Sequence, residues 1–328
     1  MHDHDGALRR ERRYPALAPW FTSAFEGDRA TFKHGDMVAF MEGPAVSRYV
    51  APVATLLDGR RSVEEISQAS DLDVDHVRRV IAKLENASLI IDGEQIPRAS
   101  ATLEAASVAA SCWGQLVDVG EAAHRLESSR VTVLGSDRVA RLVGQQLVEM
   151  GLACSVVSRD GVGAALVDEA RGADLLILGP SSVQTIARSV NAQLYEAQTA
   201  WLPVFPFNGR YVEIGPLIVP PDSGCFECFL LRRQANVTYS AEVYDFAASA
   251  SADRARDYAP LAHASAATAA FVAHQWLAVR HPEMPGVSYL ERAGSWERET
   301  HHLLRVPRCP VCSPAAERGI PAAWWSTP

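Results

Sequence analysis

The sequence predicts an α/β protein with two domains: an N-terminal winged helix-turn-helix domain, then a parallel-sheet domain that carries a structural zinc site. Three observations predict this fold class. A strand hairpin and three short helices open the chain, strands alternate with helices after Val131, and two C-x-x-C pairs lie in the last third. The 328 residues are enough for two domains, and we expect residues 1–95 to form the first and residues 96–328 the second.

The N-terminal domain is expected to begin after a flexible, arginine-rich lead-in, residues 1–19. Residues 29–33 and 37–41 read as two strands joined by a His34-Gly35-Asp36 turn, which is a β-hairpin. Three helices follow, each with a favourable first residue, and they begin at Pro44, Ser62 and Asp73. A short strand at residues 89–91 completes the order of a winged helix-turn-helix.

The charge of the chain argues against nucleic acid, the usual partner of a winged helix. The net charge is −8, and residues 1–93 carry 12 basic against 15 acidic side chains, whereas phosphate binding needs a dense basic surface. The third helix does present Arg78, Arg79 and Lys83 on its polar face. Two interpretations stay open: a solvated face with ion pairs inside the helix, or a basic wall for an acidic peptide.

The second domain is expected to contain a parallel sheet, reached through a helical connector at residues 102–117. Its first strands are three apolar segments, at residues 131–135, 154–158 and 174–178. Residues 203–207 and 211–219 are expected to continue this sheet and to be joined by an Asn208-Gly209 hairpin turn. An alanine-rich helix at residues 261–279 is interpreted as core or as a subunit contact.

The turn after the first of these strands lacks a phosphate-binding pattern. A nucleotide-binding turn has the form G-x-G-x-x-G, whose second glycine lets a phosphate approach the backbone. Here the turn reads Gly135-Ser136-Asp137-Arg138-Val139-Ala140, so that Asp137 replaces the second glycine and faces any phosphate with a negative charge. The sequence therefore predicts the fold of a nucleotide-binding domain without its phosphate site.

Two C-x-x-C pairs, 80 residues apart, predict a metal site. Their members are Cys225, Cys228, Cys309 and Cys312. Each pair is a short knuckle that directs two thiolates at one point, and four thiolates form a closed tetrahedral Zn²⁺ site. A redox dithiol needs one pair and a catalytic zinc keeps an open position, so we expect a structural Zn²⁺. Cys112 and Cys154 are expected to be isolated, buried small side chains.

The chain shows no sign of a membrane or secretory address. No apolar run approaches the ~20 residues of a membrane span, and the N-terminus, M-H-D-H-D-G, lacks a signal-peptide pattern. We therefore expect a cytoplasmic protein, in which paired cysteines bind metal or serve redox chemistry and do not form structural disulfides.

Two segments of the first domain carry a resemblance to a known family. L-L-D-G-R-R-S-V-E-E-I (56–66) and H-V-R-R-V-I-A-K-L-E-N-A-S-L-I (76–90) look like PqqD-like leader-peptide recognition domains. In that family a leader peptide adds as a strand to the exposed hairpin edge and packs against the third helix. The resemblance implies a leader site at Met37, Val38, Ala39, Phe40 and Met41, where the side chains of the bound strand meet Arg78, Arg79 and Lys83.

The second domain resembles the ThiF-like, Rossmann-type fold of adenylating enzymes in its parallel sheet and its two cysteine knuckles. Those enzymes hold ATP and magnesium with an Asp-rich end of the second strand and an Asn-Leu-x-Arg-Gln segment. Here the second strand ends in Ser158-Arg159-Asp160, so Asp160 alone remains, and no Asn-Leu-x-Arg-Gln follows. The resemblance therefore covers the fold and the zinc but departs at the nucleotide site.

Two further blocks indicate a subfamily. F-N-G-R-Y-V-E-I-G-P-L-I-V-P-P-D-S-G-C-F-E-C-F (207–229) and R-V-P-R-C-P-V-C-S (305–313) look like the precursor-peptide-binding partner of azoline-forming cyclodehydratases. With the domain order, this resemblance covers most of residues 20–315. In that family a YcaO-type protein uses ATP to activate a backbone amide, and Cys, Ser or Thr side chains of the peptide then cyclise.

Three functions follow from these observations. The resemblance favours a non-catalytic scaffold that binds a ribosomal precursor peptide by its leader, delivers it to a YcaO-type cyclodehydratase and activates that partner. The alternative is a working ThiF-like adenylating enzyme that acts on a peptide, which the glycine loop disfavours. A winged-helix regulator is disfavoured by the acidic charge. Related adenylating folds often dimerise, so the resemblance also implies a possible homodimer.

Overall fold

The chain divides into two compact units. The computed structural model describes residues 14–93, 100–112, 118–158, 172–236 and 258–313, and contacts divide the chain into Met1–His124 and Arg125–Pro328. The assignment of residues 1–95 and 96–328 to two functional domains stays a prediction.

A three-stranded antiparallel sheet forms the first layer of the N-terminal unit. Its strands are β2 (Thr22–Glu26), β3 (Arg29–His34) and β4 (Met37–Glu42), in the order β2-β3-β4. The expected hairpin is confirmed as β3 and β4, in which Thr31 lies opposite Phe40. β2 was missed, and it makes β3 the central strand, where Phe32 is fully buried.

Part of the expected lead-in is ordered, which corrects the prediction for residues 1–19. β1 (Pro15–Leu17) pairs antiparallel with β5 (Ile90–Asp92), the strand after the third helix. Ala16 and Ala18 are buried, so small apolar side chains between the two prolines hold this segment in place. Residues 1–13, with their basic cluster, lie outside the described residues.

Four helical segments follow β4 in the N-terminal unit. They are η1 (Val46–Val50), α1 (Ala51–Ala54), α2 (Val63–Ser70) and α3 (Val74–Asn86). The single helix expected from Pro44 is a π-helical turn followed by a short α-helix, and Pro52, which lacks an N–H, lies where the two meet. The capping box is confirmed: the Glu65 N–H donates to Ser62 Oγ at 3.2 Å, and the Ser62 N–H donates to Glu65 Oε2 at 2.8 Å.

The core of the N-terminal unit lies between its sheet and its helices. Val77, Val80, Ile81 and Leu84 form the buried stripe of α3, as the sequence spacing predicts, and they share a cluster with Phe32 of β3. Two more helices follow, α4 (Ser100–Cys112) and α5 (Val119–Ser128). α4 covers most of the expected connector helix, whose residues 113–117 lie outside the described part.

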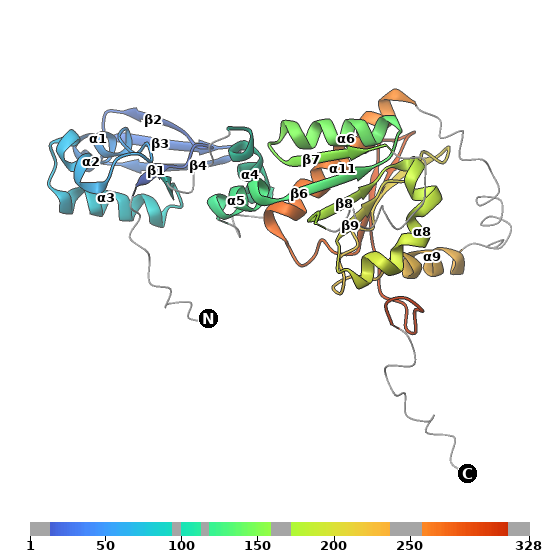
Figure 1. Ribbon diagram of the computed structural model, residues 1–328. Coiled ribbons are helices and arrows are strands. Elements are labelled where there is room, and N and C mark those ends of the chain that lie inside the picture. The colour runs from blue at the N-terminus through green and yellow to red at the C-terminus, as the bar shows by residue number, and fades with distance from the viewer. Residues whose placement is uncertain (1–13, 94–99, 113–117, 159–171, 237–257, 314–328) are drawn as a thin grey trace, which may run out of the picture. The chain divides into compact units, whose positions relative to one another are not determined.

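A four-stranded parallel sheet is the centre of the second unit, as expected of a Rossmann-like domain. Its strands are β6 (Arg130–Leu134), β7 (Ala153–Val157), β8 (Leu175–Leu178) and β9 (Trp201–Pro203), in the order β7-β6-β8-β9. α6 (Arg138–Glu149) links β6 to β7, and α8 (Pro180–Glu196) links β8 to β9. The first connection leads toward one edge of the sheet and the second toward the other edge. Right-handed crossovers therefore place α6 and α8 on opposite faces of the sheet (Figure 1).

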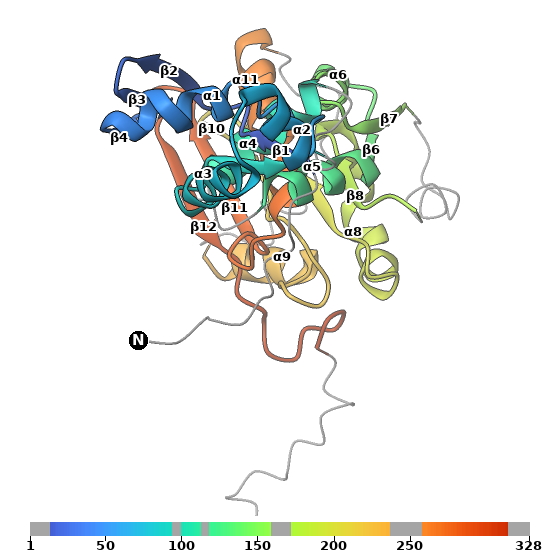
Figure 2. The ribbon, with the colours of Figure 1, turned by 90° about the vertical axis from the view of Figure 1, so that its left-hand side faces the viewer.

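Residues 211–219 do not continue the sheet as a parallel strand, which corrects the prediction, and they meet the β9 segment only through the isolated antiparallel bridges of Trp201 with Ile218 and Val204 with Ile214. β10 (Tyr211–Ile214) pairs antiparallel with β11 (Val287–Arg292), which pairs with β12 (Arg298–His302), and the three strands lie side by side (Figure 2). The expected turn is confirmed, because Asn208 Oδ1 accepts from the N–H groups of Arg210 and Tyr211 at 3.0 Å. A hairpin turn reverses the chain, so the returning segment can only run antiparallel to β9.

Two helices complete the second unit. α9 (Phe226–Ala235) begins at the first cysteine knuckle, and α11 (Ala259–Val279) packs along α6. α11 is apolar on most of its surface and buries fifteen of its residues, so it is a core helix of this unit. None of the helices in the described part of the chain combines the length and the apolar character that a membrane crossing requires.

Candidate functional site

The four predicted cysteines come together in one buried cluster. Cys225 precedes the first turn of α9 and Cys228 lies within that turn, while Cys309 and Cys312 lie in the turns after β12. The Sγ–Sγ distances are 4.0 Å for Cys225 and Cys228, 3.6 Å for Cys225 and Cys309, and 3.3 Å for Cys228 and Cys312. A disulfide needs about 2.05 Å, so these sulfur atoms are not bonded to one another.

The geometry of the cluster fits a tetrahedral metal ion. Four sulfur atoms at about 2.3 Å from a central Zn²⁺ lie about 3.8 Å apart, and the measured distances scatter around this value. All four side chains are buried, and their sulfur atoms lie within 4.8 Å of one another. Burial raises the pKa of the Cys312 thiol to about 11, so the cluster needs a cation to hold thiolates. The four cysteines can therefore bind a metal ion.

Groups that the sequence did not single out hold the knuckles in place. The Val306 N–H donates to Cys228 Sγ at 3.3 Å, and Asn191 Oδ1 of α8 accepts from the Phe226 N–H at 3.0 Å. Arg188 of α8 binds Glu227 of α9 through Nε and Nη2, at 3.1 and 3.0 Å. No local motif reveals these residues, because each acts on a segment far away in the sequence.

The two remaining cysteines do not join the cluster. Cys112 is exposed, which corrects the expectation of a buried side chain. Cys154 is half-buried in β7, and burial raises the pKa of its thiol to about 11. Neither thiol is therefore positioned as a metal ligand of the cluster.

Asp137 occupies the point where a nucleotide-binding fold holds its ligand. Ligands of open parallel sheets bind where neighbouring crossovers diverge, which here is between β6 and β8. Asp137 follows β6 and caps α6, because its Oδ1 accepts from the Ala140 N–H at 2.9 Å. Its Oδ2 accepts from the N–H and the Oγ–H of Ser181, at the start of α8, at 3.1 and 2.7 Å. One carboxylate therefore fills the position between two helix N-termini that attract anions.

The backbone around Asp137 is packed tightly against this carboxylate. A Cβ atom on Gly135 would lie 3.0 Å from Asp137 Oδ2 and 2.9 Å from the Ala140 Cβ atom. A Cβ atom on Gly179, which precedes α8, would lie 3.0 Å from both of these atoms. The absence of a side chain at Gly135, the glycine predicted for the tight turn, thus lets the carboxylate of Asp137 lie close to the backbone. Asp160, the other residue considered for a nucleotide site, lies outside the described residues.

The strand that is predicted to bind a leader peptide, β4, lies at the edge of the N-terminal sheet. β4 is the last strand in the order β2-β3-β4, so within the described part of this unit one of its edges has no neighbouring strand. Val38 and Phe40 are 53% and 58% exposed, and Met37 is 50% exposed. Ala39 and Met41 pack against the core instead. The five predicted residues therefore share one strand but divide between its two faces.

The three predicted cations of α3 do not share one side of the helix. Arg78 Nη2 lies 3.6 Å from Glu64 Oε1 of α2. Arg79 and Lys83 lie one turn apart on another side, which they share with His76. The His76 ring stacks on Tyr49 of η1, with 4.9 Å between ring centroids. Arg79 and Lys83 thus lie toward the helix that follows β4, whereas Arg78 lies toward α2.

Comparisons with known proteins identify the fold and leave the family open. No family model matches the sequence, and no curated protein matches it. The solved structure of the heterocyclase TruD matches with a TM-score of 0.69 and 20% identity, over 92% of this chain and 43% of that one. A heterocyclase in complex with substrate and cofactor matches with a TM-score of 0.68 and 18% identity, over 92% and 40% of the two chains.

A third solved structure has the same fold over nearly its whole length. Escherichia coli MccB in complex with ATP matches with a TM-score of 0.57 and 14% identity, over 91% of this chain and 99% of that one. The present chain therefore spans less than half of the heterocyclase chains and almost all of MccB. At identities of 14% to 20%, this structural likeness shows a shared fold.

Proposed function

We propose that this chain is a scaffold that binds the leader of a ribosomal precursor peptide as an added strand on β4. The exposed edge of β4 carries this proposal. Its main-chain groups can form ladder hydrogen bonds with an extended peptide, and Val38 and Phe40 can contact alternate side chains of that peptide. On this proposal residues 1–95 act as a PqqD-like domain of winged helix-turn-helix type.

The proposal assigns the chemistry to a second protein. The bound precursor is delivered to a YcaO-type cyclodehydratase, which uses ATP to form azolines from Cys, Ser or Thr residues and which this chain activates. The fold shared with TruD, a heterocyclase, supports this class of reaction. The proposed metal of the four-cysteine cluster is a structural Zn²⁺, which links the turns after β12 to α9. A homodimer is proposed on the resemblance to adenylating folds, which often dimerise. Light scattering of the purified protein tests this proposal.

A reconstitution experiment tests the proposed function. Purified chain, YcaO-type partner and candidate precursor peptides are mixed with ATP, and mass spectrometry counts the water molecules lost from each peptide. The proposal predicts rapid loss of water with both proteins present and little with the partner alone. A precursor without its leader should react slowly in both mixtures. Equal rates with and without this chain would refute the scaffold role.

The alternative is an adenylating enzyme that acts on a peptide. The fold shared with ATP-bound MccB favours it, whereas the carboxylate of Asp137 between α6 and α8 opposes a bound phosphate. Titration calorimetry with ATP and Mg²⁺ separates the two functions. A measurable heat of ATP binding to this chain alone would favour the adenylating enzyme.

A further inference from the structure

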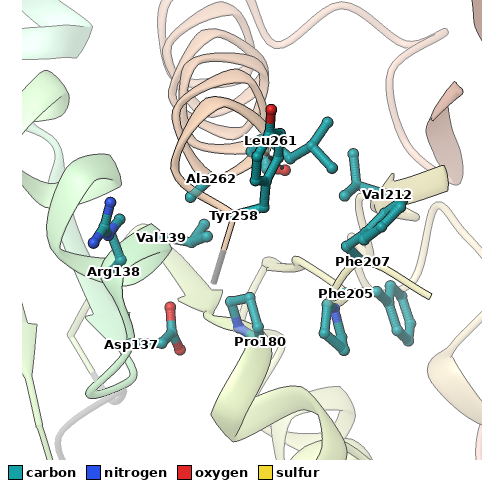
Figure 3. Close-up of a pocket in the computed structure, with 12 residues that line it drawn as sticks. Asp137, Arg138, Val139, Pro180, Phe205, Phe207, Val212, Tyr258, Leu261 and Ala262 are labelled. Atoms are coloured by element: carbon teal, nitrogen blue, oxygen red, sulfur yellow. Dashed lines mark hydrogen bonds between the residues drawn. The ribbon is translucent and has the colours of Figure 1, made fainter. Parts of the chain in front are cut away.

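A small apolar pocket lies beside Asp137, within the second unit. It has a volume of about 110 Å³ and lies between the start of α6, the start of α8 and the N-terminal turns of α11 (Figure 3). Its apolar lining includes Val139, Pro180, Phe205, Phe207, Val212 and Leu261. This pocket lies where the fold directs ligands, yet its lining differs from that of a phosphate site.

Two of the polar side chains that line this pocket, Asp137 and Ser265, make their hydrogen bonds to other parts of the fold. Both oxygens of Asp137 accept hydrogen bonds from the first turns of α6 and α8. Ser265 Oγ donates to the Leu261 carbonyl at 2.7 Å. A small free ligand is ordinarily oriented by a few polar groups that point at it. A side chain that enters this pocket would therefore be oriented chiefly by the partner polypeptide to which it belongs.

The size and charge of the pocket restrict its occupant further. An empty apolar cavity of roughly 150 Å³ accepts benzene, whereas pockets for nucleotide-sized ligands occupy about 300 to 1,000 Å³. A volume of about 110 Å³ suits part of one ring, with the remainder at the pocket mouth. Asp137 and Arg138 place opposite charges beside the pocket, so a charged guest of either sign meets a like charge as well as an opposite one, which favours an uncharged guest. Phe205 and Phe207 both line the pocket, and aromatic rings pack favourably against one another.

We propose that this pocket binds one uncharged aromatic side chain, presented by a polypeptide partner. The pocket belongs to the second unit, so the proposal is independent of the leader site on β4. The position that holds a nucleotide phosphate in other proteins with such a parallel sheet would then bind the side chain of a protein partner.

Ligand-observed NMR with capped amino acids tests this proposal. The probe is N-acetyl-phenylalaninamide, and N-acetyl-alaninamide is the matched control without a ring. The full chain should give saturation transfer to the first and little to the second, with affinity at least about tenfold higher for the aromatic probe. Equal signals from the two probes would overturn the proposal, as would displacement of the aromatic probe by ADP.

Two variants locate the binding. Ala262→Phe places a ring in the pocket and should reduce transfer at least about tenfold, whereas Ala267→Phe makes the same change at an exposed position of α11 and should have no effect. Phe207→Ala removes a half-buried lining ring and should weaken binding several-fold, so it decides the matter if Ala262→Phe fails to fold. Unchanged binding in the folded pocket variants would overturn the proposal.

Discussion

The side chain of Asp137 shows how one substitution changes the use of a fold. The sequence revealed the charge that replaces a glycine, and from it the loss of the phosphate site was predicted. The sequence did not reveal that the carboxylate binds Ser181, because this partner lies 44 residues away. A bond across the sheet depends on the order of the strands, which local spacing does not show.

Replacing Asp137 by alanine should destabilise the protein. The first turns of α6 and α8 would lose their acceptor, and loss of a helix cap costs about 0.5–2 kcal/mol in free energy of unfolding. Asp137→Asn is the matched control, since asparagine still caps α6, and it should cost less. Urea unfolding of the three proteins measures the difference. A stability of Asp137→Ala equal to that of the wild type would show that water replaces the carboxylate without cost.

The cations of α3 should contribute unequally to binding of an acidic leader. Arg79→Glu with Lys83→Glu should weaken binding roughly tenfold at low salt, since each exposed charge pair is worth up to about 1 kcal/mol. Arg78→Glu should have a smaller effect, because Arg78 lies 3.6 Å from Glu64 of α2. Fluorescence anisotropy with a labelled leader peptide at two salt concentrations measures these affinities. If Arg78→Glu weakened binding most, the leader would contact the α2 side.

At the scale of elements, β4 provides the test of strand addition. The N–H groups of adjacent residues in a strand point to opposite edges, so only one of Val38→Pro and Ala39→Pro removes an N–H that faces a guest strand. That variant should keep the fold and bind the leader roughly fivefold to tenfold more weakly, as expected for about 1 kcal/mol per hydrogen bond. Circular dichroism identifies the folded variant and anisotropy gives its affinity. Full affinity in the folded variant would exclude pairing along β4.

The cysteine knuckles should bind about one zinc per chain, as expected for one four-thiolate site. Cys309→Ser removes a buried ligand and should lose the metal and lower the melting temperature. Cys154→Ser is the matched control, since Cys154 lies in β7, apart from the cluster, and it should keep the metal. Plasma mass spectrometry of the purified proteins counts the metal. Wild-type protein without metal, in which all six cysteine thiols can be titrated, would refute the site.

Elements with local signals were predictable, whereas pairings between distant segments were not. The capping box of Ser62 and Glu65 and the turn at Asn208 are written within a few residues, and both are confirmed. β1 was missed because Pro15 suggested a loop, although its partner is β5, at the other end of the domain. The sheet of β10, β11 and β12 was missed because β11 lies more than 70 residues after β10.

At the scale of the whole molecule, the acidic charge predicts an absence of duplex DNA binding. The chain carries 39 acidic against 31 basic side chains, and DNA affinity depends on neutralised phosphates. Anisotropy with a labelled duplex at low salt should show no saturable binding. Tight binding that falls steeply as salt is added would favour a winged-helix regulator instead.

The four-cysteine cluster was predictable over a long range because the spacing of cysteines is visible in any sequence. Two C-x-x-C pairs indicate one shared set of ligands even when they lie far apart in the sequence. The structure brings all four sulfur atoms together. The sequence could not reveal which elements the site joins. The structure shows that it ties the turns after β12 to the start of α9, which Arg188 and Asn191 of α8 hold in place.

An exposed strand edge that accepts a peptide also accepts other strands. β4 presents three large apolar side chains, Met37, Val38 and Phe40, on an edge without a neighbouring strand in the described part of its unit. Such edges promote aggregation, and natural proteins often protect them with charged side chains. On β4 this protection is partial: it comes from Glu42 and from the Arg29 guanidinium, which lies over the Phe40 ring. The proposed recognition surface would therefore also be the weak point for solubility. A bound leader would act as a protective cover, keeping the protein in solution at concentrations where the empty form precipitates.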